Sequence, residues 1–152
     1  MSPSRDDLSE RARLRPPTRG AMLLLALGMA AVFGVARWLE PDPRGFGTHQ
    51  QLGLPPCHFR WVTGHSCPTC GMTTSFAWFV RGRLDRSWEA NPAGVFLAPM
   101  CLALVPWLIA GAARGKPIGC RSLETPLIGL VVATVALSLL SWTIRLLLGS
   151  AL

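Results

Sequence analysis

The chain has 152 residues, of which 50% are apolar and only 15% are charged. Soluble domains usually carry about 25% charged residues, so this composition favours a membrane protein. The net charge of +7 comes from basic residues that lie beside apolar runs. Because these residues form no basic patch with interleaved aromatic side chains, the sequence argues against nucleic-acid binding.

Three apolar stretches, residues 20–39, 92–113 and 126–145, each have about the 20 residues needed to cross a bilayer. Lipid offers the backbone no hydrogen-bond partners, so each stretch is expected to be an α-helix. The sequence therefore predicts an all-α integral membrane protein in which residues 20–148 form a single domain in the lipid bilayer. An alternative for the first stretch is a signal peptide.

Basic residues suggest an orientation for these helices. The arm of residues 1–19 is polar and predicted to be disordered, and Pro16-Pro17 is expected to stop any helix there. The arm and the link after the second stretch both carry basic residues, and three crossings place them on one side. The positive-inside rule predicts that this side, with the N-terminus, is cytoplasmic. A cluster of arginines at 81–86 argues the other way.

Two sequence features predict how the helices begin and pack. Ala26, Ala30 and Gly34 recur every four residues and would let another helix approach, from a protein partner or a second copy of the chain. Asn91 followed by Pro92 is typical of a helix start, with asparagine as the N-cap.

Cysteine and histidine are concentrated outside the apolar stretches, in a loop and short helix at residues 54–90. Cys57, Cys67 and Cys70 have the spacing C-x9-C-x2-C, with His58 and His65 beside the first two. Three thiolates and one imidazole would complete a tetrahedral metal site, for which zinc is the usual ion. The pattern predicts such a site, with His65 or His58 as the fourth ligand.

Two other chemistries suit the same cysteines. A Cys-x-x-Cys pair at the start of a short helix, residues 72–80, could perform thiol–disulfide exchange, with Cys67 attacking and Cys70 resolving. That short helix would lie in the membrane interface or re-enter the membrane. Alternatively, Cys57 forms a disulfide with one of the pair. The other two cysteines are predicted to be inert: Cys101 and Cys120.

The cysteine segment resembles a known family. Cys57, then GHSCPTCGMT, then RGRLDRSWEANP before an apolar helix is similar to a family of small bacterial membrane proteins catalogued as a domain of unknown function, DUF2752. The match covers about residues 54–99. Thr74 departs from it, since the family usually has arginine there. The resemblance implies a multi-span membrane protein and no established activity.

Two functions remain open at this point. No paired carboxylates suited to acid–base catalysis occur in the apolar stretches, which favours a non-enzymatic protein. In that interpretation the Cys/His cluster is a structural metal or disulfide clamp, as in an accessory subunit of a membrane complex. The alternative is a membrane thiol–disulfide oxidoreductase that uses Cys67 and Cys70.

Overall fold

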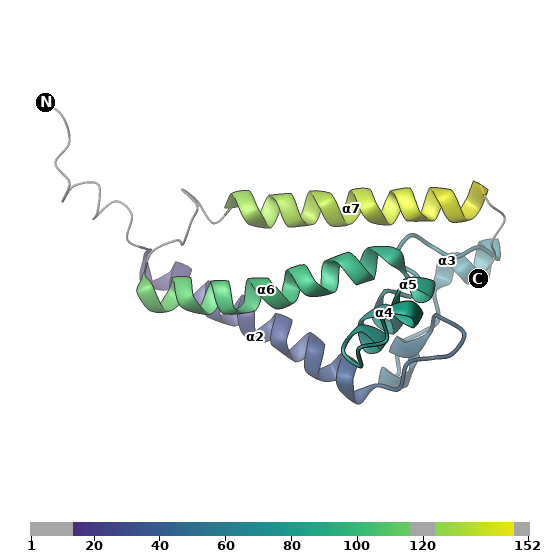
Figure 1. Ribbon diagram of the computed structural model, residues 1–152, viewed down its shortest axis with the longest axis horizontal. Coiled ribbons are helices and arrows are strands. Elements are labelled where there is room, and N and C mark those ends of the chain that lie inside the picture. The colour runs from purple at the N-terminus through teal and green to yellow at the C-terminus, as the bar shows by residue number, and fades with distance from the viewer. Residues whose placement is uncertain (1–13, 116–123, 148–152) are drawn as a thin grey trace, which may run out of the picture.

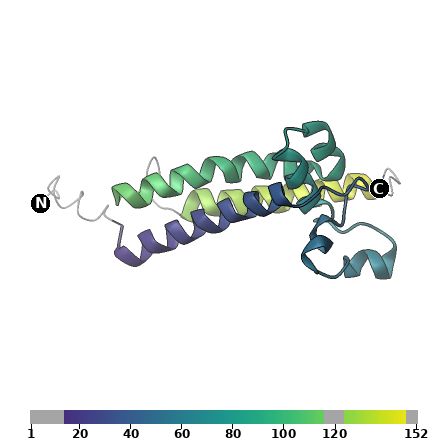
Figure 2. The same cartoon turned by 90° about the horizontal axis from the view of Figure 1, so that it is seen from below.

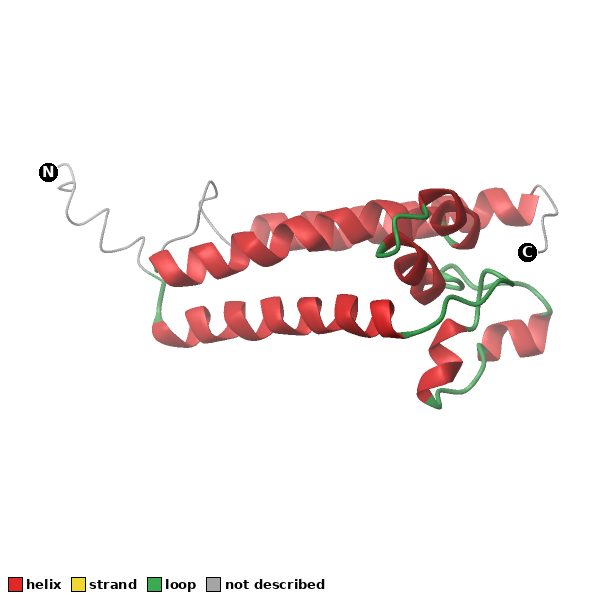
Figure 3. Ribbon diagram, turned by 60° about the horizontal axis from the view of Figure 1, so that its bottom comes forward, coloured by secondary structure: helices red, strands yellow, loops and turns green. Residues whose placement is uncertain are grey.

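The computed structural model describes residues 14–115 and 124–147 (Figure 1). Within these ranges the secondary structure is helical and contains no strand, which confirms the predicted all-α fold. The elements in chain order are α2 (Pro16–Trp38), η1 (Thr48–Leu52), α3 (His58–Thr63), α4 (Met72–Phe79), α5 (Leu84–Ala90), α6 (Pro92–Arg114) and α7 (Glu124–Leu147). Figure 3 shows that loops separate the short helices and gather at one end of the molecule.

The three long helices α2, α6 and α7 are long and apolar enough to cross a membrane, as the sequence predicts. Helix α2 begins at Pro16, four residues before the expected start, and Pro16-Pro17 opens this helix instead of stopping it. A proline is tolerated in the first turn because the amide there has no partner within the helix. The rest of the arm, residues 1–13, lies outside the described residues.

One end of the bundle brings together the start of α2 and the end of α6, whereas α7 begins farther along, toward the lobe (Figure 1). The Leu14 amide donates to the Gly115 carbonyl over 2.7 Å, and Arg19 Nε donates to the Ala112 carbonyl over 2.7 Å. The basic link at 116–123, including Cys120, falls outside the described residues.

The other end carries a compact lobe, which we define as residues 39–91 and which contains η1, α3, α4 and α5 (Figure 2). Helix α4 was expected at the membrane interface or as a re-entrant segment. In the structure it contacts α2, α5 and α6, and Thr74, Ser75 and Phe76 are buried. A Cβ on Gly94 of α6 would lie 2.5 Å from Ser75 Oγ, so glycine permits this close approach.

The main contact between long helices joins α2 to α6. Met22 and Ala26 of α2 are buried against Leu108 and Ala112 of α6. Ala26 therefore packs within the chain, whereas the other two members of the predicted small-residue face are exposed: Ala30 and Gly34. Association of the protein through this face stays a prediction.

Buried hydroxyl groups join the helices inside the lobe. Ser75 Oγ lies 2.9 Å from Ser87 Oγ and donates to the Asn91 carbonyl over 3.0 Å. Thr48 Oγ1 lies 2.8 Å from Thr74 Oγ1. Buried polar groups are costly unless they find partners, and these hydroxyls find them in each other. The contacts fix α4 against η1, α5 and the start of α6.

Arg81 holds the lobe to the end of α2. Its guanidinium donates to the carbonyls of Ala36 over 3.0 Å and Leu39 over 2.7 Å. The last carbonyls of a helix lack partners within the helix, and a cation is favoured beside them. The ion pairs beside and within α5 are Arg83–Asp85 and Arg86–Glu89.

Candidate metal centre in the lobe

The lobe brings the three cysteines of the C-x9-C-x2-C pattern together. Cys57 immediately precedes α3, and Cys67 and Cys70 lie in the turn before α4. Their sulfur atoms all lie within 4.8 Å of one another. The three thiols are free and half-buried. The sequence pattern therefore identified residues that the fold gathers into one cluster.

The turn that carries two of these cysteines depends on Gly71. The Cys70 amide donates to the Cys67 carbonyl over 3.0 Å, which closes the turn. Gly71 follows with φ of +82°, a conformation that side chains disfavour, and a Cβ there would also meet the Gly45 carbonyl at 2.6 Å. Glycine at position 71 thus allows both the backbone conformation of the turn and its close contact with the rest of the lobe.

Asn91 fastens the same turn to the second long helix. Its side-chain amide donates to the Cys70 carbonyl over 2.9 Å, while its Oδ1 accepts from the Ala93 amide over 3.0 Å. The second bond confirms the predicted N-cap of α6. The bond from the Asn91 side chain to the Cys70 carbonyl was not predicted from the sequence. Asn91 and Pro92 do, however, belong to the sequence motif that resembles the family.

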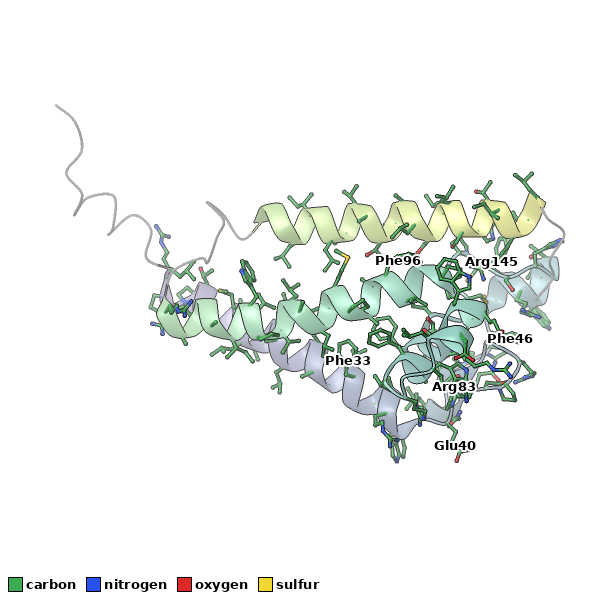
Figure 4. All side chains as sticks on the ribbon, in the orientation of Figure 1. Phe33, Glu40, Phe46, Arg83, Phe96 and Arg145 are labelled. Carbon is green, nitrogen blue, oxygen red and sulfur yellow. The ribbon has the colours of Figure 1, made fainter. Side chains whose placement is uncertain are left out.

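The end of α7 also reaches the cysteine segment. Trp142 Nε1 donates to the Ser66 carbonyl over 2.7 Å, and the Trp142 ring meets Phe59 edge-on with centroids 6.4 Å apart. The guanidinium of Arg145, labelled in Figure 4, lines a cavity together with Ser66 and Cys70. These contacts join residues far apart in the chain, and no local sequence signal indicates them.

The thiols of the Cys-x-x-Cys pair differ in acidity. Burial by itself would raise the pKa of Cys67, but hydrogen bonds from Thr69, Cys57 and Cys70 outweigh burial and lower this pKa. Burial is the largest cause that raises the pKa of Cys70 to about 11, and negative charge on the other two cysteines raises it as well. Within the Cys-x-x-Cys pair, Cys67 is therefore the more acidic thiol.

The structure does not bring the predicted histidine ligands into the three-sulfur group. His65 is exposed and its Nδ1 lies 2.8 Å from the Thr63 carbonyl. His58 is also exposed, with its ring 5.8 Å from that of Trp61. The cluster that the described residues form thus consists of three thiols.

A cavity of about 600 Å³ opens beside the cluster, and all three cysteines line it. Other lining residues include Arg44, Arg60, Trp61 and Phe46. The Arg60 guanidinium lies 3.6 Å from the centroid of the Phe46 ring, which Arg44 approaches at 5.2 Å. No local sequence signal indicates these arginines, because they come from separate loops and helices of the lobe.

Thr74, which stands where the resembled family usually has arginine, is fully buried and bonded to Thr48. Cationic groups reach the cysteines from other positions in this chain. Arg60 lines the cavity, and Arg145 of α7 lines a neighbouring cavity together with Cys70. Positive charge beside the cluster therefore does not depend on residue 74.

These features define an all-helical membrane protein with a three-thiol cluster at one end of its long helices. The model of the family described as "Protein of unknown function (DUF2752)" matches residues 57–105, from the first cysteine into α6. The family resemblance seen in the sequence is thereby confirmed. No curated protein and no solved structure matches the chain.

Proposed function

We propose that this membrane protein binds one metal ion through Cys57, Cys67 and Cys70, and that the ion clamps the lobe onto the long helices. The observation that carries the proposal is the mutual approach of three sulfur atoms within 4.8 Å. A disulfide staple would use two sulfurs and would not need the third nearby. Three thiolates suit zinc or another soft ion.

The donor set fits a zinc ion. Zinc–sulfur bonds are about 2.3 Å long, so two sulfurs of a tetrahedral site lie roughly 3.8 Å apart. The separations in the lobe, at most 4.8 Å, approach that value in the free thiols. Arg60 beside the cluster would offset the negative charge that three thiolates bring to a divalent cation.

A clamp at this position would act on all three long helices. The cysteine turn is bonded to Asn91 at the start of α6, and Ser66 within the same segment is bonded to Trp142 of α7. Arg81 joins the lobe to the end of α2. Such a fixed end would suit an accessory subunit that presents its helices to a membrane complex.

Metal analysis of the detergent-purified full chain tests the clamp. We expect about one zinc ion per chain, and slow alkylation of the three lobe cysteines until a chelator is added. Cys57→Ser should lose the ion and lower the melting temperature. Cys101→Ser is the matched control, because Cys101 lies in α6 outside the cluster, and it should retain the metal. A metal-free wild-type protein would refute the clamp.

A second candidate function is thiol–disulfide exchange, and it is supported by the position of Cys67 and Cys70 on an open cavity just before α4. In this reaction the two thiols would become a disulfide while a substrate disulfide is reduced to two thiols. Cys67→Ser should then abolish turnover and leave the melting temperature unchanged. Loss of stability without any wild-type turnover would favour the clamp.

We infer further that the N-terminus is cytoplasmic and the lobe faces the opposite side. Arg15, Arg19 and Arg114 gather at the end of the bundle that lacks the lobe, and basic residues near helix ends favour the cytoplasmic side. The lobe also carries arginines, but Arg83 and Arg86 are held in ion pairs with acidic neighbours.

A further inference from the structure

We propose that the cavity beside the three cysteines binds a small thiol that carries a carboxylate. The sulfur of this ligand would complete the metal shell, and its carboxylate would bind Arg60. The inference rests on the proposed metal function, and it names the class of molecule that the centre would bind.

The first support is the number of ligands that the chain supplies. In the described part of the chain, the group of metal-ligating side chains holds three cysteines and no fourth member. A zinc site with four protein ligands is closed, whereas one with three keeps a position for an exchangeable ligand. His49 also lines the cavity, but its Nε2 lies 3.3 Å from the Pro55 carbonyl and it is not part of the three-sulfur group. A three-thiolate centre in this lobe would therefore take its fourth ligand from another molecule.

The second support is the space next to the sulfurs. Cys57, Cys67 and Cys70 all line the cavity of about 600 Å³. Sites for small molecules usually enclose roughly 300–1,000 Å³, so a ligand much larger than water fits here. A ligand bound in this space would lie beside all three sulfurs.

The third support is the charge around the cavity. Its lining, as far as the chain is described, includes Arg44 and Arg60 and no acidic side chain. Arg44 is bound to Asp42 over 2.7 Å. Arg60 is oriented by the Phe46 ring and by a bond of 2.8 Å to Ser66 Oγ. A guanidinium oriented in this way is suited to a carboxylate.

These supports together define the ligand class. A metal already held by thiolates accepts a further soft donor readily, which favours sulfur over oxygen at the fourth position. A carboxylate on the same small molecule would place negative charge near Arg60. Neither a simple carboxylate nor an uncharged thiol meets both requirements.

Cobalt substitution of the full chain in detergent provides the test, since Co²⁺ in a thiolate site has visible bands that report its ligands. We would titrate the cobalt protein with 3-mercaptopropionate, 2-mercaptoethanol and propionate. We expect 3-mercaptopropionate to change the visible bands at a concentration about tenfold lower than 2-mercaptoethanol, because only the former makes a charge-assisted contact. Propionate should leave the bands unchanged.

Arg60→Gln should remove the tenfold preference while the protein still binds cobalt. Arg83→Gln is the matched control, because Arg83 forms an exposed ion pair and does not line this cavity. The comparison of the two thiols on the wild-type protein tests the carboxylate contact even if the Arg60 variant does not fold.

The outcomes separate this inference from the metal proposal. Failure of the wild-type protein to bind cobalt would overturn both. Cobalt bands that do not respond to thiols but change in His49→Ala, His58→Ala or His65→Ala would show that the protein supplies its own fourth ligand, which overturns only the inference. Equal responses to the two thiols would overturn the role of Arg60.

Discussion

At the scale of single residues, both backbone conformation and close packing require glycine at position 71. Its φ of +82° is a conformation that a side chain disfavours, and a Cβ would collide with the backbone carbonyls of Gly45 and Ala90. Gly82 offers a comparison, because it has a similar φ of +73° but nothing within 4 Å of its Cβ position. Alanine substitutions at the two glycines therefore separate the cost of the backbone conformation from the cost of a steric collision.

Gly71→Ala should lower the free energy of unfolding by about 3 kcal/mol or more, because collision with fixed carbonyls adds to the conformational cost. Gly82→Ala should lower it by only about 1 kcal/mol, the cost of the left-handed conformation. Thermal unfolding of both variants in detergent measures the difference. Equal losses would show that the carbonyls move aside easily.

The cysteines of the Cys-x-x-Cys pair should ionise at different pH values in the metal-free protein. The pKa of Cys67 is lowered, whereas that of Cys70 is raised to about 11. The thiolate is the reactive form, so Cys67 should be alkylated at lower pH than Cys70, which should react fully only as the pH approaches about 11. Mass spectrometry after timed alkylation assigns each site. Identical pH profiles would contradict this order.

At the scale of secondary-structure elements, the junction between α2 and the lobe depends on one side chain. Arg81 donates to carbonyls of Ala36, Arg37 and Leu39 at the end of α2, and to Ala77 within its own segment. An arginine beside several carbonyls that lack partners within the helix donates hydrogen bonds to them. Its positive charge also interacts favourably with the negative end of the helix dipole.

Arg81→Met should therefore destabilise the protein by about 2–4 kcal/mol, because the substitution leaves several carbonyls without their charged donor. Arg83→Met should leave the stability nearly unchanged, since its ion pair is exposed to solvent. Chemical or thermal unfolding of the two variants provides the comparison. Similar stabilities would mean that the Arg81 contacts contribute little.

The elements that depend on local pattern were predictable from the sequence. Apolar length indicated the three long helices, and the pair Asn91-Pro92 indicated where α6 begins. Cysteine spacing indicated the thiol cluster. Contacts between distant segments were not predictable from the sequence. Examples are the contact of Trp142 with Ser66 and that of Arg81 with the end of α2. The local sequence around each residue does not indicate its partner, because the partner lies far away in the chain.

At the scale of the whole molecule, the described helices form a bundle with two different ends. Helix α7 runs beside α6 and finishes at the lobe (Figures 1 and 2). A reporter attached after α7 would therefore lie on the same side of the membrane as the lobe, provided that α7 crosses.

We expect a C-terminal alkaline phosphatase fusion to be active in a bacterial host and a C-terminal green fluorescent protein fusion to be dark, because the lobe is inferred to face away from the cytoplasm. Phosphatase activity and fluorescence, normalised to the amount of fusion protein, provide the measurement. The reverse result would place the lobe in the cytoplasm, where thiols remain reduced.

The position of Trp61 has a practical consequence for spectroscopy. The chain has six tryptophans and no tyrosine, so its ultraviolet emission comes from indole rings without a tyrosine background. Trp61 lines the cavity that contains the three cysteines, and an open-shell ion such as Co²⁺ bound there would quench its emission, whereas Zn²⁺, with its filled d shell, would not. Arrival of an open-shell ion at the cluster could then be followed in real time on the unlabelled protein, with Trp61→Phe as the silent reference.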